Sequence, residues 1–201
     1  AKMARVLSTS ETDSYAKNSF QYDQLFQDIK AEWQTRYAIA STGVPKINTQ
    51  CAYLMALKYN LLRDENAVRR TVTALRSAIS NNAYKLNTGF LGTAILNQTL
   101  TENGLNDEAY TLLLQRNDPS WLYSIDQGAT TIWERWNSYT KASGYGPVSM
   151  NSFNHYAYGI IAEWMFRHMA GICPDEANAG FRHFILRPNP DTRKTLRYQQ
   201  K

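Results

Sequence analysis

The sequence has few of the residues that build metal centres and disulfide frameworks. Its 201 residues include only two cysteines, Cys51 and Cys173, and three histidines. The cysteines lie far apart, show no CxxC spacing and have no histidine companions at metal-ligand spacing. We therefore expect no metal site, while a disulfide between the two cysteines stays open.

Long apolar runs and cofactor-binding fingerprints are also absent. No stretch approaches the length of a transmembrane helix, and the N-terminal AKMARVLSTS lacks the apolar region of a signal peptide. We expect no membrane partner, and the compartment is left open. Phosphate-loop and dinucleotide motifs are missing, as is the GxSxG elbow of serine hydrolases. These absences argue against cofactors and against serine–histidine–aspartate catalysis.

The basic residues are scattered rather than gathered into a patch. Lysine and arginine number 22 against 17 aspartates and glutamates, and the densest basic cluster is the terminal segment 193–201. No aromatic or glycine pattern of an RNA-binding module accompanies this tail, so we expect it to be solvated and expect no nucleic-acid partner. The 43% hydrophobic and 19% charged content is typical of a packed globular protein.

The chain begins without an initiator methionine, on what looks like the end of a helix. A length of 201 residues fits one domain or a piece of a larger one. We expect a piece of a longer polypeptide, with the remainder of that polypeptide as its partner.

Helical periodicity dominates the sequence. In the first long segment Tyr22, Leu25, Ile29 and Trp33 recur on one face, opposite a charged face. Gly104 fits the left-handed position after a helix, and Asn106 fits the N-cap of the next one. The expected helices cover residues 13–37, 53–61, 68–79, 91–100, 107–116 and 153–168.

Two segments depart from this periodicity. Residues 118–150 are rich in Pro, Ser, Gly, Thr and aromatics without a sustained period, and loops of this length are usually functional. Residues 181–188, FRHFILRP, alternate with a period near two and predict a strand of a separate β element.

The order of these segments predicts an all-α fold built from antiparallel helical hairpins. Short turns fall at one end of the array, while the segments TGFLGT at 88–93 and 119–136 fall at the other. Such an arrangement is typical of an (α/α)6 toroid. Six hairpins need twelve helices, so the chain would supply about half of one.

Glu134 is the leading candidate for chemistry. It lies in GATTIWERW at 128–136, beside Arg135 and between Trp133 and Trp136, in a chain with five tryptophans. A carboxylate walled by indoles is partly desolvated and tunable, which suits general acid–base work on a sugar ring. The plainer interpretation is a surface ion pair with Arg135 beside core tryptophans.

Other polar and aromatic residues fall in the same region of the sequence. His155, in MNSFNHYAYG, could bond a substrate hydroxyl or orient Glu134, or could satisfy backbone groups at a helix start. Asp126 could accept hydrogen bonds from sugar hydroxyls or serve a turn, and Trp121 could stack on a sugar or belong to the core. Thr49 and Gln50 open the second helix and could reach the same end of the bundle.

The order of TGFLGT, ENG with DEAYTLLLQ, PSWLY, GATTIWERW and MNSFNHYAYG resembles that in the catalytic domain of bacterial α-L-rhamnosidases, large inverting glycoside hydrolases. The resemblance runs from the first long helix to FRHFILRPNP. It implies the C-terminal half of an (α/α)6 barrel in residues 1–175, with the upstream half absent from this chain, and the start of a C-terminal β-sandwich in 176–201. It also implies release of terminal α-L-rhamnose with Glu134 as general base. His155 is then expected to contact the sugar, and Trp121, Trp133 and Trp136 are candidates for lining the pocket.

One departure from the family pattern limits this expectation. Inversion needs a second carboxyl group as general acid, which in the family lies on a segment upstream of the part this chain matches. No such segment occurs in these 201 residues. We therefore expect the chain to be inactive alone. A non-catalytic sugar-binding or structural relative, and a toroid glycosidase for another sugar, stay as alternatives.

Overall fold

The computed structural model describes residues 1–8, 13–178 and 180–193. Most of them are helical, with two small two-stranded sheets, so the expected all-α class is confirmed only in its main part. The basic tail beyond Arg193 lies outside the described residues. In chain order the first helices are α1 Lys2–Leu7, α2 Ser14–Tyr37, α3 Gln50–Lys58, α4 Glu65–Asn81, α5 Gly89–Glu102 and α6 Asn106–Leu113.

Three successive helices begin at short polar side chains that cap them. Asp13, Thr49 and Asp64 each accept a hydrogen bond from the backbone N–H three residues later, at the starts of α2, α3 and α4. The expected helices at 13–37 and 68–79 are confirmed, although α4 begins earlier than expected, at Glu65, and ends at Asn81. The segment 88–93, expected as a loop, instead contains the start of α5: Thr88 is its N-cap and the helix begins at Gly89.

The turn between α5 and α6 confirms one expectation and corrects another. Gly104 has φ +76°, and the N–H of Leu105 donates to the carbonyl of Leu100 at 2.8 Å, which closes α5 in the left-handed manner predicted. Asn106 does not cap α6, because Leu105 occupies the N-cap. The Asn106 side chain instead accepts a hydrogen bond from the Thr101 hydroxyl at 3.2 Å.

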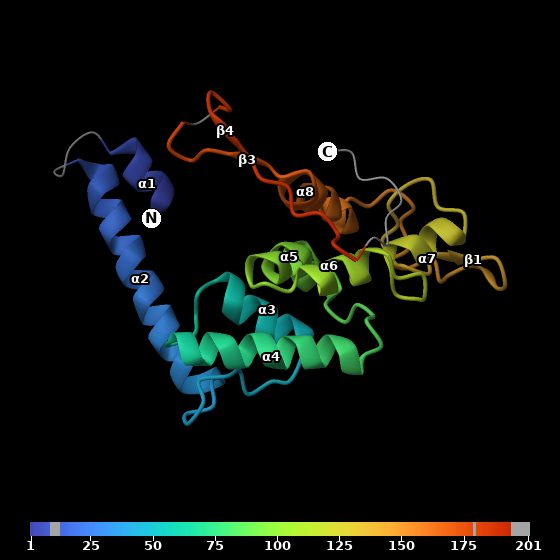
Figure 1. The fold of residues 1–201 in the computed structure, drawn as a ribbon, viewed down its shortest axis with the longest axis horizontal. Coiled ribbons are helices and arrows are strands. Elements are labelled where there is room, and N and C mark those ends of the chain that lie inside the picture. The colour runs from blue at the N-terminus through green and yellow to red at the C-terminus, as the bar shows by residue number, and fades with distance from the viewer. Residues whose placement is uncertain (9–12, 179, 194–201) are drawn as a thin grey trace.

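The helical body has α5 at its centre. It packs against α3 on one side, against α6 on another and against the short helix α8, Ile161–Trp164, near its C-terminal end (Figure 1). The long α2 extends away from this body and carries α1 at its far end (Figure 1). The core of the body consists of side chains from α3 to α6 with two tryptophans, chiefly Leu54, Leu75, Ile79, Leu96, Leu100, Tyr110, Leu112, Trp121 and Trp164.

The region 118–150, expected to be irregular, contains a short helix and a short two-stranded sheet. Helix α7, Trp121–Asp126, is capped by the Ser120 hydroxyl, which accepts from the N–H of Tyr123. Strands β1, Tyr139–Thr140, and β2, Gly144–Tyr145, form an antiparallel pair. Both elements are too short to leave a period in the sequence.

The last helical segment starts later than expected and is not uniform. It runs from the 3-10 turn η1, Ala157–Ile160, through α8 into the π-helical turn η2, Met165–Met169. Gly171 then ends it with φ +75°. The predicted strand is present as β4, Phe184–Leu186, and its antiparallel partner is β3, Ile172–Pro174.

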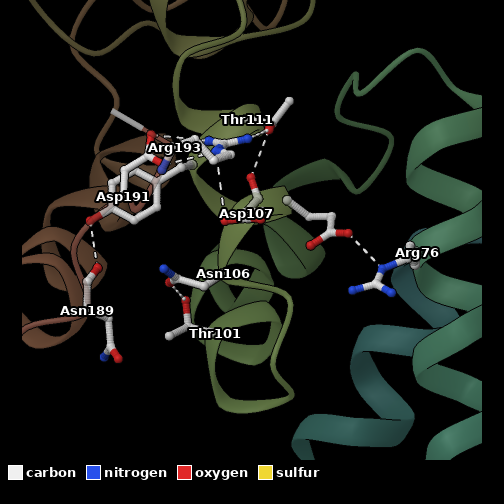
Figure 2. Close-up of polar contacts among 10 residues, drawn as sticks. Arg76, Thr101, Asn106, Asp107, Thr111, Asn189, Asp191 and Arg193 are labelled. Carbon is white, nitrogen blue, oxygen red and sulfur yellow. Dashed lines mark hydrogen bonds and ion pairs between the residues drawn. The ribbon is translucent and has the colours of Figure 1, made fainter. Parts of the chain in front are cut away.

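The segment after β4 returns to the helical body and docks on α6. The hydroxyl of Tyr110 donates to the carbonyl of Asn189 at 2.8 Å, and the Arg193 guanidinium donates to Asp191 at 2.9 Å and to the Thr111 hydroxyl. Figure 2 shows Arg193 placed between Asp191 and the α6 residues Asp107 and Thr111.

Both cysteines, Cys51 and Cys173, are free thiols, so the disulfide left open from the sequence is not formed.

Candidate functional site

Two loop segments lie against each other at the start of the last helical segment and together hold Glu134. The N–H of His155 donates to the carbonyl of Ile132 at 2.8 Å, and the N–H of Glu134 donates to the carbonyl of Ser152 at 2.9 Å. The hydroxyl of Thr131 also donates to the carbonyl of Phe153. The two motifs expected to carry the chemistry are thus fastened together by backbone bonds.

The Glu134 carboxylate is half-buried and held by a single protein donor. Its Oε2 accepts a hydrogen bond from the N–H of Ser152 at 2.8 Å. Its Oε1 has no hydrogen-bond partner among the described residues. The ion pair with Arg135 offered by the plainer interpretation is not formed in the described part of the chain, where Arg135 bonds through its backbone to the Ser138 hydroxyl. One oxygen of Glu134 is therefore anchored and the other is available.

The tryptophans of the motif support this loop from its inner side. Trp133 packs edge-on against Phe153, and Trp136 stacks on Tyr158 with ring centroids 3.8 Å apart. Trp121 meets Trp136 edge-on, and its indole N–H donates to the carbonyl of Tyr158 at 2.8 Å. Trp121 and Trp133 are each only 7% exposed. The cavity of about 60 Å³ between them is apolar. In this chain they are core residues, and their contact with a sugar stays a prediction.

His155 lies beside the Glu134 loop with its ring packed on an aromatic side chain. Its Nδ1 accepts a hydrogen bond from the N–H of Ala157 at 3.2 Å, and its ring stacks on Phe90 at the start of α5. A neutral imidazole that accepts at Nδ1 carries its proton on Nε2, so Nε2 is a donor. Phe90 was not singled out from the sequence, although it lies within TGFLGT, because nothing in the sequence indicates which distant residue it meets.

Asp126 is occupied by another partner. It is the last residue of α7, and both of its carboxylate oxygens bond to the guanidinium of Arg116, at 2.6 and 2.8 Å. The structure therefore brings together Glu134 and His155 but gives Asp126 a structural ion pair. Its role toward a sugar stays a prediction.

Thr49 and Gln50 lie at the edge of a polar hollow between α3 and α4. Thr49 caps α3, while the Gln50 amide donates to the carbonyl of Lys85 and accepts from the N–H of Asn87. The hollow has a volume of about 400 Å³ and is lined mainly by amide and hydroxyl groups. Gln50 thereby fixes the segment that leads into α5 and Phe90.

Metal clusters and membrane-spanning helices are both absent from the described residues. Among residues 1–8, 13–178 and 180–193, no group of three or more His, Cys, Asp or Glu side chains could hold a metal ion. Over the same residues no helix is both long enough and apolar enough to cross a bilayer.

Comparison with known proteins gives matches along almost the whole chain. Residues 1–169 match the bacterial alpha-L-rhamnosidase 6 hairpin glycosidase domain. The chain is 46% identical to an alpha-L-rhamnosidase of Streptomyces avermitilis over 175 residues, which are 87% of this chain and 16% of that protein. It is 42% identical to one of Formosa agariphila over 190 residues, 94% of this chain and 20% of that protein. The chain thus spans a fifth or less of these curated relatives.

Solved structures agree with the sequence matches. The crystal structure of the Streptomyces avermitilis α-L-rhamnosidase complexed with L-rhamnose has a TM-score of 0.82 at 42% identity and covers 94% of this chain and 17% of its own. The native α-L-rhamnosidase of Aspergillus terreus also scores 0.82, at 32% identity, covering 88% of this chain and 20% of its own. The family match over residues 1–169 and these shared folds show that the chain belongs to the bacterial α-L-rhamnosidase six-hairpin glycosidase family.

Proposed function

We propose that this chain carries the general-base side of an inverting α-L-rhamnosidase site, with Glu134 as the base. The observation that carries the proposal is the asymmetry of the Glu134 carboxylate. Its Oε2 accepts the N–H of Ser152, while its Oε1 has no partner in the described structure. A backbone donor thus anchors one oxygen, and the second oxygen is placed to take a proton from water.

The substrate side of the proposal rests on His155 and on the relatives. The solved Streptomyces avermitilis structure holds L-rhamnose, and this chain covers 17% of that protein. We assign His155 Nε2 as a donor to a rhamnose hydroxyl, since its Nδ1 is occupied by the N–H of Ala157. Terminal α-L-rhamnose on a glycoside or polysaccharide is the proposed substrate.

The proposal places the general acid outside these 201 residues. In an inverting glycosidase the two carboxyl groups stand about 6.5 to 9.5 Å apart, with the attacking water beside the base. The acid would come from an upstream half of the barrel, and β4 would begin a C-terminal β-sandwich. Below, the complete enzyme means these residues together with the remainder of their polypeptide.

Replacement of Glu134 by Gln in the complete enzyme tests the base directly. We expect hydrolysis of 4-nitrophenyl α-L-rhamnoside to fall by about 10² to 10⁴-fold, because the amide cannot accept the proton of the attacking water. Glu65→Gln, on an exposed glutamate of α4, is the control and keeps normal turnover. Near-normal turnover by Glu134→Gln would exclude the assignment.

The alternative functions give different results in the same assays. A non-catalytic sugar-binding relative would bind L-rhamnose but show no turnover even with Glu134 intact. A toroid glycosidase for another sugar would cleave a different member of a panel of aryl glycosides, since the fold does not fix the substrate.

A further inference from the structure

The imidazole of His155 lies nearly flat on the phenyl ring of Phe90. The two ring centroids are 5.0 Å apart and the planes differ by 15°. Phe90 is the second residue of α5, far from His155 in the sequence. The stack therefore joins the central helix of the body to the loop that follows Glu134.

Phe90 is itself fixed by the aromatic core. Its ring meets Tyr158 at 5.0 Å with the planes tilted by 55°, and Tyr158 is buried against Trp136. Aromatic pairs of this geometry contribute about 0.5 to 1.5 kcal/mol beyond the area that they bury. The phenyl ring thus offers His155 a rigid surface.

His155 has little else to set the plane of its ring. The hydrogen bond from the N–H of Ala157 to Nδ1 is 3.2 Å long, at the weak end of the normal range. Tyr156 also stacks on the imidazole, at 5.6 Å, but its own side chain is 88% exposed and has little to hold it. The χ2 torsion of histidine is broad, so one weak bond does not define where Nε2 points.

We propose that Phe90 is a positioning residue that orients His155 so that Nε2–H points to the sugar. The proposal rests on the proposed function, in which His155 binds a rhamnose hydroxyl. Phe90 acts through the flat contact of its ring. An aromatic replacement therefore preserves the effect, and an aliphatic one of similar bulk does not.

Substitutions at Phe90 in the complete enzyme test the need for an aromatic ring. We expect Phe90→Leu to weaken L-rhamnose binding, measured by calorimetry, and to lower kcat/KM for 4-nitrophenyl α-L-rhamnoside, each on the order of tenfold, because Nε2 is no longer aimed. Phe90→Tyr keeps both within about twofold. Equal losses in the Leu and Tyr variants, or none in the Leu variant, would overturn the proposal.

A double-mutant cycle with His155→Ala separates positioning from simple destabilisation. If Phe90 acts through His155, the double variant Phe90→Leu/His155→Ala binds L-rhamnose no more weakly than His155→Ala alone. Leu96→Ala, which replaces a buried residue on the same helix, is the matched control. Its fold loss in L-rhamnose affinity should multiply with the fold loss caused by His155→Ala. Multiplicative effects in the Phe90 cycle would show a purely structural role.

The binding measurements also keep this proposal apart from the assignment of Glu134. Near-normal turnover by Glu134→Gln would exclude Glu134 as the base. It would not affect the double-mutant cycle of Phe90 and His155, because that cycle measures L-rhamnose binding. Unchanged binding in His155→Ala would overturn the Phe90 proposal while leaving Glu134 as the base.

Discussion

At the scale of single residues, Gly104 and Gly171 end two helical segments in the same conformation but in different surroundings. Their φ angles are +76° and +75°. A β-carbon on Gly104 would meet nothing within 4 Å, whereas one on Gly171 would lie 2.1 Å from backbone atoms of Arg187 and Pro188. The sequence predicts both helix ends, because a glycine follows each period. It does not predict the crowding at Gly171, which depends on the return of the chain after β4.

This difference predicts unequal effects of substitution by alanine. Gly104→Ala should cost about 1 to 2 kcal/mol, the ordinary penalty of a left-handed residue with a side chain. Gly171→Ala should cost at least about 3 kcal/mol, because the overlap is with backbone that cannot rotate away. Thermal unfolding of the two variants of the complete enzyme, followed by tryptophan fluorescence, shows which substitution lowers Tm more. Equal shifts in Tm would show that the segment at Arg187 moves freely.

At the scale of elements, the docking of residues 187–193 on α6 depends on an ionised Asp191. Its side chain is fully buried and accepts hydrogen bonds from Arg193. These bonds hold the pKa of Asp191 below its ordinary value, despite the opposing effect of burial. The contact therefore contributes its full stability at pH values above the unfolded-state pKa of Asp191, near 3.9. This contribution is lost as the pH falls through the lower folded-state pKa. The neighbouring Tyr110 has its pKa raised to about 12, chiefly by burial, and stays neutral.

We expect Asp191→Asn to lower stability by about 1 to 3 kcal/mol at pH 7, as for other hydrogen bonds between charged groups. The difference from the unsubstituted enzyme should shrink as the pH falls below about 4, because the unfolded chain takes up a proton on this carboxylate before the folded chain does. Asp107→Asn is the control, since Asp107 is exposed and lies 3.8 Å from Arg193. Chemical denaturation at several pH values measures the free energy of unfolding of both variants and of the unsubstituted enzyme. A deficit that is constant from pH 7 to pH 3 would contradict the ionic origin.

The elements themselves were predictable where they are long and poorly so where they are short. The period of α2 and α4 places those helices from the sequence, whereas the N-cap bonds of Asp13 and Asp64 that fix their first residues are seen only in the structure. The pairs β1–β2 and β3–β4 have two or three residues per strand, which is too few for a period. Their partners are chosen by tertiary packing, so only β4 was predicted and its pairing with β3 was not.

At the scale of the whole molecule, the site forms where segments far apart in the sequence meet. Glu134 and His155 were both identified from their motifs, but their connection through Ser152 and Ile132 exists only in the folded chain. The same is true of the stack of Phe90 on His155 and of the pairing of Asp126 with Arg116. Sequence motifs indicate which residues matter, and the contacts decide what each one can do.

The last prediction concerns the completeness of this site. As the proposed base, Glu134 would activate water, but a glycosidic bond breaks by inversion only when a second carboxyl group protonates the leaving oxygen. Because that group is proposed to lie outside the 201 residues, the isolated chain should give no release of 4-nitrophenol from 4-nitrophenyl α-L-rhamnoside above the rate in buffer. The complete enzyme should restore turnover, and Glu134→Gln should lower it again by about 10² to 10⁴-fold. Turnover by the isolated chain that depends on Glu134 would instead place the acid within these residues.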